Sequence, residues 1–498
     1  MKLRFNQGDA LVQEFEGWIR AGQAQRVAAQ LTEMNLSAVP NKLRLPLANI
    51  CRRIGLPAQG LKLLSPLVQR NHGKNIAGAS ASEEERAEYA VLLLRKGIVN
   101  EAVEILDEIN PQTVPAALLY RSFCHFRKWE YAEAIPRLEK YLSSDLNDYS
   151  RLVGQVNLVA AHIGDGQLEK AAPELNDLTR SLEDGQAGRL KGNCLELTAQ
   201  LALLQGHYKE SLAHLEKAEQ ALTEMPTLDH FFVFKWRAIA KGLDSRDPSP
   251  LIELKEAASR IGNWETVREA DRFLLRVAPT TENMEHLIFG TPHPAYRRRI
   301  QQETILRTTS QSYLWGMADG PVLNMVNLGL SSVPDFANWG KCAELLEVLM
   351  RDFYVPCPMG SAFAELWPDE HFDIFSSPAR LHQITYRTRQ LLHESRLPFA
   401  IEEKNGMYRI LRTGGGGIIV PQIRRSLSGY RMELEKLMSA LPPHTIFTAR
   451  QARSLLQMSR VTFQRFSAWA ISQNLMTRQG MGSTTAYRLA APAAAVAA

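Results

Sequence analysis

Residues 166–175 read GQLEKAAPEL, and the same pattern occurs at residues 97–106, 129–138 and 206–215. In each copy a small residue stands five positions after the first, and a leucine follows four positions later. The small residues are Ala102, Ala134, Ala171 and Ser211. A small side chain lets two antiparallel helices approach closely, while apolar residues spaced three and four apart fill their interface. Because each copy follows another apolar helical stretch, the pattern predicts helical hairpins stacked in an array.

The pattern resembles the tetratricopeptide repeat, whose second helix carries the matching small residue. The family's small residue in the first helix corresponds to Ala90, Ser122 and Val159 in three of the repeats. Weaker copies that start at residues 22, 55 and 262 extend the array, so residues 1–285 are expected to form about six or seven hairpins. The resemblance implies a protein or peptide partner on the concave face. The alternative is an array that only spaces or dimerises the other domains.

Charge is distributed unevenly along the chain. From residue 374 onward there are 17 Lys and Arg against 5 Asp and Glu, and no acidic residue follows Glu435. The whole chain carries +5, so residues 1–373 carry −7. A basic C-terminal part favours a polyanion as partner, because Lys and Arg displace counterions from phosphate. A basic surface kept for solubility is the alternative.

Composition and cysteine usage indicate an ordinary protein of the cytoplasm. The start has no apolar stretch typical of a signal peptide, and no window is apolar enough for a membrane span, so no membrane partner is expected. The cysteines are odd in number and never in a C-x-x-C pair, which predicts buried free thiols and no zinc site. They are Cys51, Cys124, Cys194, Cys342 and Cys357.

Residues 286–412 are expected to form a first winged-helix domain. Three amphipathic helices precede two β-type runs around EKNG at residues 403–406, which is typical hairpin chemistry. ELWPDE (365–370), RLHQITYRTRQLL (380–392) and GMYRI (406–410) resemble the winged-helix output domain of bacterial response regulators, although no receiver domain precedes them. Leu381, Thr385, Thr388 and Leu392 are expected to face the core. The predicted DNA contacts on the other side and in the hairpin are Arg380, Gln383, Tyr386, Arg387, Gln390 and Lys404, with Arg389 either structural or on phosphate.

Residues 413–430 contain four consecutive glycines at 414–417 and are expected to form a flexible linker, because a phosphate loop would need a Lys and a Ser or Thr after the glycines. Residues 431–490 then resemble the winged helix-turn-helix domains of small bacterial repressors. SRVTFQRFSAWAISQ (459–473) matches the Ser-Arg-x-Thr start of their recognition helix, with Phe463, Phe466 and Ala470 facing inward. The predicted DNA contacts are Arg460, Thr462, Gln464 and Arg465 in the helix and Arg478, Ser483 and Thr484 in the wing. Residues 491–498 are expected to be a disordered tail.

The sequence therefore predicts a mainly α protein: a solenoid of tetratricopeptide-like hairpins followed by two winged-helix (α+β) domains. No nucleophile with a base, paired carboxylates or metal-ligand spacing is present, so neither enzyme activity nor a cofactor is expected. The favoured function is a bacterial transcriptional regulator that binds double-stranded DNA and receives a protein or peptide signal, with homodimerisation left open. A scaffold whose winged helices contact proteins is the alternative, and RNA binding is a third.

Overall fold

The computed structural model describes the chain except residues 1–7, 21–22, 69–80, 183–187, 223–226, 307, 309, 326–338, 369, 422–433, 435–436, 439, 442–444, 457, 473–474, 481–484 and 490–498. Two compact units are present. The first comprises residues 1–362 and 372–422, and the second comprises residues 363–371 and 423–498. The predicted boundaries after residues 285 and 412 both fall inside the first unit. None of the described helices is long and apolar enough to cross a membrane.

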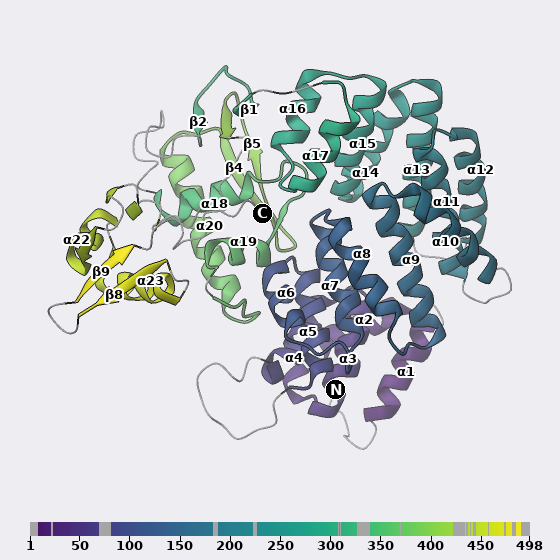
Figure 1. The fold of residues 1–498 in the computed structure, drawn as a ribbon, viewed down its shortest axis with the longest axis horizontal. Helices are drawn as coiled ribbons and strands as arrows, with labels where there is room; N and C mark the ends of the chain where they lie inside the picture. Colours follow the sequence, from purple (N-terminus) through teal and green to yellow (C-terminus); the bar gives the residue numbers. More distant parts are fainter. Residues whose placement is uncertain are drawn as a thin grey trace. The chain divides into compact units, whose positions relative to one another are not determined.

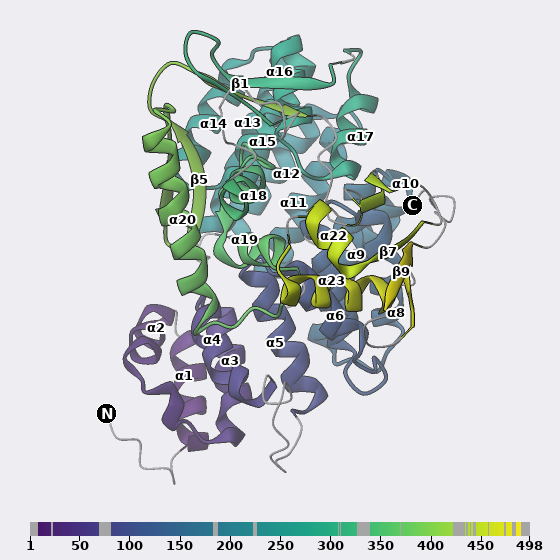
Figure 2. The same cartoon turned by 90° about the vertical axis from the view of Figure 1, so that its left-hand side faces the viewer.

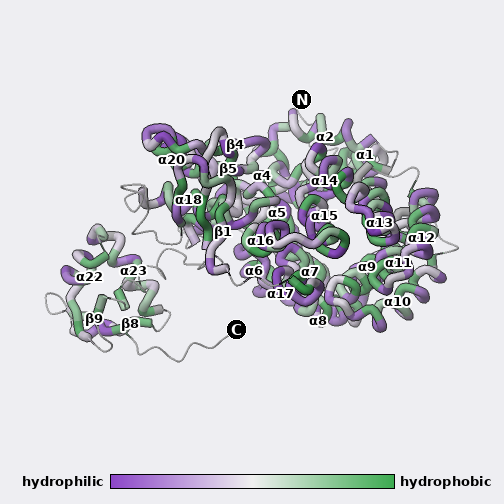
Figure 3. The backbone as a smooth tube through the Cα atoms, turned by 90° about the horizontal axis from the view of Figure 1, so that it is seen from above, coloured by the Kyte–Doolittle hydropathy of each residue, from purple (hydrophilic) through white to green (hydrophobic). Residues whose placement is uncertain are grey.

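The first unit begins with successive helical hairpins (Figure 1). Their helices are α1 (Gly8–Arg20), α2 (Ala24–Glu33), α3 (Asn41–Arg53), α4 (Pro57–Val68), α5 (Glu83–Arg95), α6 (Val99–Asp107), α7 (Ala116–Arg127), α8 (Tyr131–Leu142), α9 (Asp148–Asp165), α10 (Leu168–Ser181), α11 (Gly188–Leu204), α12 (Tyr208–Ala221), α13 (Thr227–Ser245), α14 (Ser249–Ile261), α15 (Trp264–Val277) and α16 (Thr281–Phe289). A short 3-10 helix, η2 (Leu36–Ala38), lies between α2 and α3. Most consecutive helices pack on each other, and those from α7 to α15 follow a curve when seen from above (Figure 3). The predicted helical array is confirmed.

The repeated sequence pattern has a direct structural cause. Its first residue adopts a left-handed backbone conformation at the turn of the hairpin, as at Gly97 (φ 84°) and Gly166 (φ 83°), where glycine is free of the Cβ clash. The small residues five positions later are fully buried: Ala102, Ala134, Ala171 and Ser211. Ser211 also donates a hydrogen bond from Oγ to the carbonyl of Ala199, 2.8 Å away. The expectation for these positions is therefore correct.

Buried charges join α15 to the chain that follows it. The fully buried guanidinium of Arg268 pairs with Asp352, and Arg272 binds both carboxylate oxygens of Glu303 at 2.6 and 2.8 Å. Glu303 ends α17 (Pro294–Glu303). Burial alone would raise the pKa of Glu303, but Arg272 and Arg299 outweigh it and lower the pKa to about 2. Two guanidinium groups thus keep this partly accessible carboxylate charged.

Two small sheets complete the first unit. One has the order β3-β5-β4 and lies with helices α18 and α20; the other has the order β1-β6-β2, with β6 antiparallel to β1 and parallel to β2. Their elements and the neighbouring helices are β1 (Ser312–Gly316), β2 (Val322–Asn324), α18 (Lys341–Leu349), β3 (Cys357–Pro358), α19 (Met359–Leu366), α20 (Ser377–Glu394), β4 (Phe399–Lys404), β5 (Met407–Arg412) and β6 (Gly417–Pro421). Figure 2 shows α20 running beside β5.

The flexible-linker prediction needs correction for residues 417–421, because they form the central strand β6. The glycines at this point permit close packing. A Cβ on Gly417 would lie 2.6 Å from Cδ1 of Leu314, and a Cβ on Gly416 would lie 2.6 Å from the carbonyl oxygen of Pro321. A short apolar strand that pairs with distant segments thus follows the glycines, where local sequence rules indicate a linker.

The described residues of the second unit include a three-stranded antiparallel sheet and the helices α22 and α23. The elements are β7 (Ile446–Thr448), α22 (Ala449–Leu456), α23 (Arg460–Ser472), β8 (Met476–Gln479) and β9 (Ala486–Leu489), and the sheet order is β7-β9-β8. Its core includes Phe447, which stacks on Tyr487 with ring centroids 6.1 Å apart. Phe463 meets the same ring edge-on at 5.3 Å. These aromatic contacts fix α23 against the sheet.

Candidate functional site

The first candidate surface is the N-terminal part of α23. Ser459 caps this helix: its Oγ accepts a hydrogen bond from the backbone N–H of Thr462 at 3.1 Å. Helix α22 begins with a reciprocal cap, in which Thr448 Oγ1 accepts from the N–H of Gln451 and Gln451 Oε1 accepts from the N–H of Thr448. Both caps satisfy amide groups that a helix start leaves without partners.

The two faces of α23 are those predicted. Phe463, Phe466 and Ala470 are buried in the core, with exposed fractions of 1% or less. Arg460, Thr462, Gln464 and Arg465 are exposed on the other side. Ser467 is also buried, and its Oγ donates to the carbonyl of Gln464 at 3.1 Å. The buried hydroxyl is thus satisfied by a local hydrogen bond.

The predicted wing residues of the second unit are only partly described. Arg478 lies on β8 and is exposed. Ser483 and Thr484 lie outside the described residues. Helix and strand thus present Arg460, Arg465 and Arg478 to solvent, with no acidic residue in the sequence beyond Glu435.

Helix α20 provides a second polar surface, in the first unit. Its buried side chains include all four that were predicted: Leu381, Thr385, Thr388 and Leu392. The exposed side carries four of the predicted contact residues, Gln383, Tyr386, Arg387 and Gln390. Gln390 donates a hydrogen bond to the Tyr386 hydroxyl at 3.1 Å. Arg380 is half-buried, so less of it is accessible than expected.

Arg389 and the hairpin define the end of this surface. The Nε of Arg389 donates to the carbonyl of Ile401 at 3.0 Å, which is a structural contact made by an exposed side chain. Lys404 is exposed at the end of β4, and it pairs with Met407 across the turn. Asn405 and Gly406 form that turn with φ of 56° and 74°, as a two-residue hairpin loop requires.

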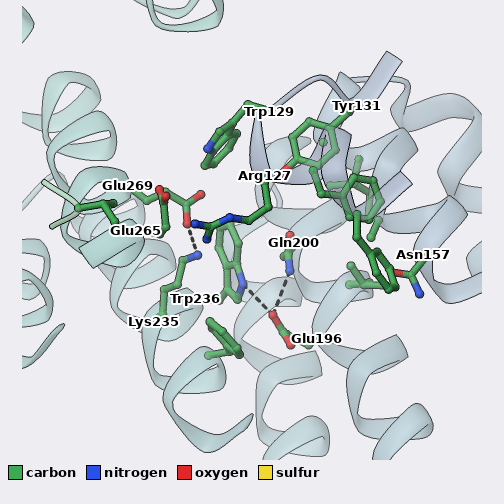
Figure 4. A pocket seen from close by; sticks show the side chains of 18 of the residues that line it. Arg127, Trp129, Tyr131, Asn157, Glu196, Gln200, Lys235, Trp236, Glu265 and Glu269 are labelled. Carbon is green, nitrogen blue, oxygen red and sulfur yellow. Dashed lines mark hydrogen bonds and ion pairs between the residues drawn. The ribbon is translucent and has the colours of Figure 1, made fainter. Parts of the chain in front are cut away.

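The array encloses a third candidate site, a cavity of about 960 Å³. It is lined by α5, α7, α9, α11, α13 and α15, together with Val355, Pro358 and Met407 from the later part of the first unit (Figure 4). Aromatic rings and charged side chains share its walls. The sequence did not single out this cavity, because its residues come from segments between Leu94 and Met407 and show no short spacing.

The acidic residues of the cavity are occupied by internal partners. Glu196 accepts hydrogen bonds from Trp236 Nε1 at 2.9 Å and from Gln200 Nε2 at 3.0 Å (Figure 4). Glu269 pairs with the Lys235 ammonium. Burial raises the pKa of Glu265, whose carboxylate lies 3.6 Å from the Nε of Arg268.

Trp129 occupies an unusual place in the cavity wall. Other hairpins have glycine at the corresponding turn, whereas Trp129 takes the left-handed conformation with φ 60°. This conformation is strained for a bulky side chain. Its ring packs edge-on against Tyr131 at 5.8 Å and against Tyr296 at 4.4 Å between centroids. Aromatic packing therefore holds an indole where the backbone would favour glycine.

Cysteine and acidic clusters offer no alternative site. All five cysteines are free, and four of them are buried, as predicted. Burial raises the pKa of the Cys51 thiol to about 12, which makes it a poor nucleophile. In the described part of the chain, no group of three or more His, Cys, Asp and Glu could hold a metal ion.

Comparison with known proteins gives low similarity. No protein-family model matches the chain, and no curated protein matches it. A tetratricopeptide repeat protein from Parabacteroides merdae ATCC 43184 is 18% identical with a TM-score of 0.35, over 54% of this chain and 99% of that chain. The human IFIT1 dimer with m7Gppp-AAAA is 10% identical with a TM-score of 0.30, over 76% of this chain and 82% of that chain. At TM-scores this low, no property of these proteins is carried over.

Proposed function

We propose that the chain is a DNA-binding transcriptional regulator in which α23 and α20 are the recognition helices of two winged-helix modules. The observation that carries this proposal is the exposed face of α23, where Arg460, Thr462, Gln464 and Arg465 surround a capped helix start. Guanidinium and amide groups at the start of a helix suit contacts with base edges and phosphates in the major groove. The mechanism is binding, with no bond made or broken.

The element order supports the same proposal. In the second unit β7, α22 and α23 precede the β8–β9 pair, which is the order of a helix-turn-helix followed by a wing. In the first unit α20 precedes the β4–β5 hairpin, and Gln383, Tyr386 and Arg387 are accessible on its outer side. The helical array would receive the signal, with a partner protein or peptide as one class of ligand.

Fluorescence anisotropy of the full chain with a random-sequence 30-base-pair duplex tests the proposal. We expect the logarithm of the affinity to fall linearly with the logarithm of salt concentration, since binding releases counterions from phosphates. Arg465→Ala should weaken binding by about tenfold or more, as loss of an arginine contact to a base or phosphate does. Arg387→Ala tests α20 in the same way.

Arg180→Gln is the matched control, because Arg180 is an exposed arginine of the array helix α10 and pairs only with Asp177 at 3.3 Å among its described contacts. It should leave the affinity unchanged. Absence of binding at low salt would refute the proposal and favour the scaffold alternative. Stronger competition by RNA than by duplex DNA would assign the basic surface to RNA instead.

A further inference from the structure

The lining of the array cavity carries more positive than negative side chains. Arg95 and Lys96 lie at the end of α5, and Arg127 lies at the end of α7. Among the contacts of the described residues, none of these three makes a side-chain hydrogen bond or salt bridge with a carboxylate. Arg127 is exposed and extends toward the Lys235–Glu269 pair in Figure 4. Among the described contacts, these three cations thus have no carboxylate within hydrogen-bonding distance, whereas Glu196 and Glu269 are already paired within the protein.

The electrostatic environment agrees with this excess. The pKa of Arg95 is lowered first by burial and then by the positive charges of Arg52 and Arg127. The pKa of Lys96 is lowered by burial. An anion placed between these groups would relieve both the repulsion and the cost of desolvation.

The remainder of the wall suits a planar group with polar edges. Trp129, Tyr131 and Trp236 supply aromatic surface, and their positions are shown in Figure 4. Asn157 donates from Nδ2 to the carbonyl of Val153 at 2.8 Å, which leaves its Oδ1 as an acceptor. Asn193 also lines the cavity. Aromatic rings and amides together are the groups that bind the face and the edge of a nucleobase.

The size of the cavity limits the class of ligand. About 960 Å³ is near the upper end of small-molecule sites, so a bare inorganic anion would fill only a small part of it. Pro358 and Met407, which come from the β3–β5 region, line the cavity together with the array helices. A compact ligand fits such a site better than an extended peptide that must run along the whole array.

We propose that this cavity binds a nucleoside phosphate, with the phosphate at Arg95, Lys96 and Arg127 and the base against Trp129 and Trp236. The binding itself does not depend on the proposed DNA contacts, because these residues belong to the array. If the chain is a regulator, the nucleotide is its signal, and that consequence alone rests on the proposed function.

Isothermal titration calorimetry of the full chain in the absence of DNA tests the proposal. The probes are the four ribonucleoside 5′-triphosphates, their monophosphates, the unphosphorylated nucleosides, inorganic pyrophosphate and an acidic hexapeptide. At least one nucleotide should bind. Its nucleoside, which lacks the phosphates, and pyrophosphate, which lacks the base, should each bind at least about tenfold more weakly. Failure of all eight nucleotides to bind would overturn the proposal, and so would preferential binding of the peptide.

Three variants and one control separate ligand binding from a structural role. Arg127→Gln and Arg95→Gln should each weaken nucleotide binding by about tenfold or more, while Arg180→Gln should not change it. Trp129→Gly removes the indole and places glycine where φ is 60°, so the backbone remains compatible with the fold. This variant should bind the nucleotide more weakly and keep a cooperative unfolding transition. Unchanged affinity in Arg127→Gln and Trp129→Gly would overturn the assignment.

Discussion

The array and the C-terminal unit use arginine in opposite ways. In the array, Arg268 and Arg272 are buried and bind carboxylates from segments later in the chain. In the C-terminal unit, Arg460 and Arg465 lie on the exposed face of α23. Net charge alone therefore says little about where a ligand binds: the acidic part of the chain contains a cationic cavity, and the basic part presents its charge to solvent.

The largest expected difference in the free energy of unfolding is between a variant that lacks a buried arginine and one that lacks an exposed arginine. Arg268→Leu leaves Asp352 without the guanidinium that its carboxylate binds, and loss of one partner of a buried pair costs about 3–5 kcal/mol. Arg465→Leu removes an exposed side chain, and we expect a change within about 0.5 kcal/mol. Chemical denaturation followed by tryptophan fluorescence measures both. Equal losses of unfolding free energy in the two variants would contradict the difference between buried and exposed arginines.

Small residues show the same contrast in packing. Ala171 is fully buried between helices, so Ala171→Leu should force the hairpin apart and destabilise the first unit by about 1–3 kcal/mol. Ala468 is exposed on α23, and Ala468→Leu is the matched control with little expected effect. The unfolding midpoints of the two variants provide the comparison. A first unit that tolerates Ala171→Leu would indicate that the spacing of the hairpins is not set by this residue.

Local sequence rules succeeded where local geometry determines structure. The repeat pattern identified the buried Ala102 and Ala134, and helical periodicity assigned the buried and exposed faces of α20 and α23. In each case the decisive residues lie within four or five positions of one another, so the period of the helix relates them directly.

Features made by distant residues were not predictable in this way. The cavity combines Arg95 with Trp236 from α13, and no sequence spacing relates them. Strand β6 pairs with β1 and β2, about 100 positions earlier, although its glycine-rich start is typical of a linker. The pairing of Arg268 with Asp352 likewise depends on how α15 packs against the chain that follows it. Long-range packing decides all three.

The surroundings of His293 also predict how the stability of the first unit depends on pH. Burial, followed by the charges of Arg268 and Arg127, lowers the pKa of His293 from 6.5 to about 3. Between pH 6.5 and about 3, His293 is therefore protonated in the unfolded chain but not in the folded chain. The free energy of unfolding should fall as pH decreases through this range. The expected slope is about 1.4 kcal/mol per pH unit for one group. Denaturation of His293→Gln between pH 7.5 and 4 should show a shallower decline, and an identical decline would contradict this assignment.

The smallest expected effect concerns the cap of α23. Ser459→Ala removes the acceptor for the N–H of Thr462, and loss of such a cap costs about 1 kcal/mol. Ser454→Ala is the matched control, since Ser454 is exposed within α22, where alanine favours the helix. Hydrogen exchange should accelerate at the first turn of α23 in Ser459→Ala only. DNA affinity should fall with it, because Arg460 and Thr462 are held in that turn. Faster exchange with unchanged affinity would place the DNA contacts elsewhere and weaken the contrast between the outward face of α23 and the inward charges of the array.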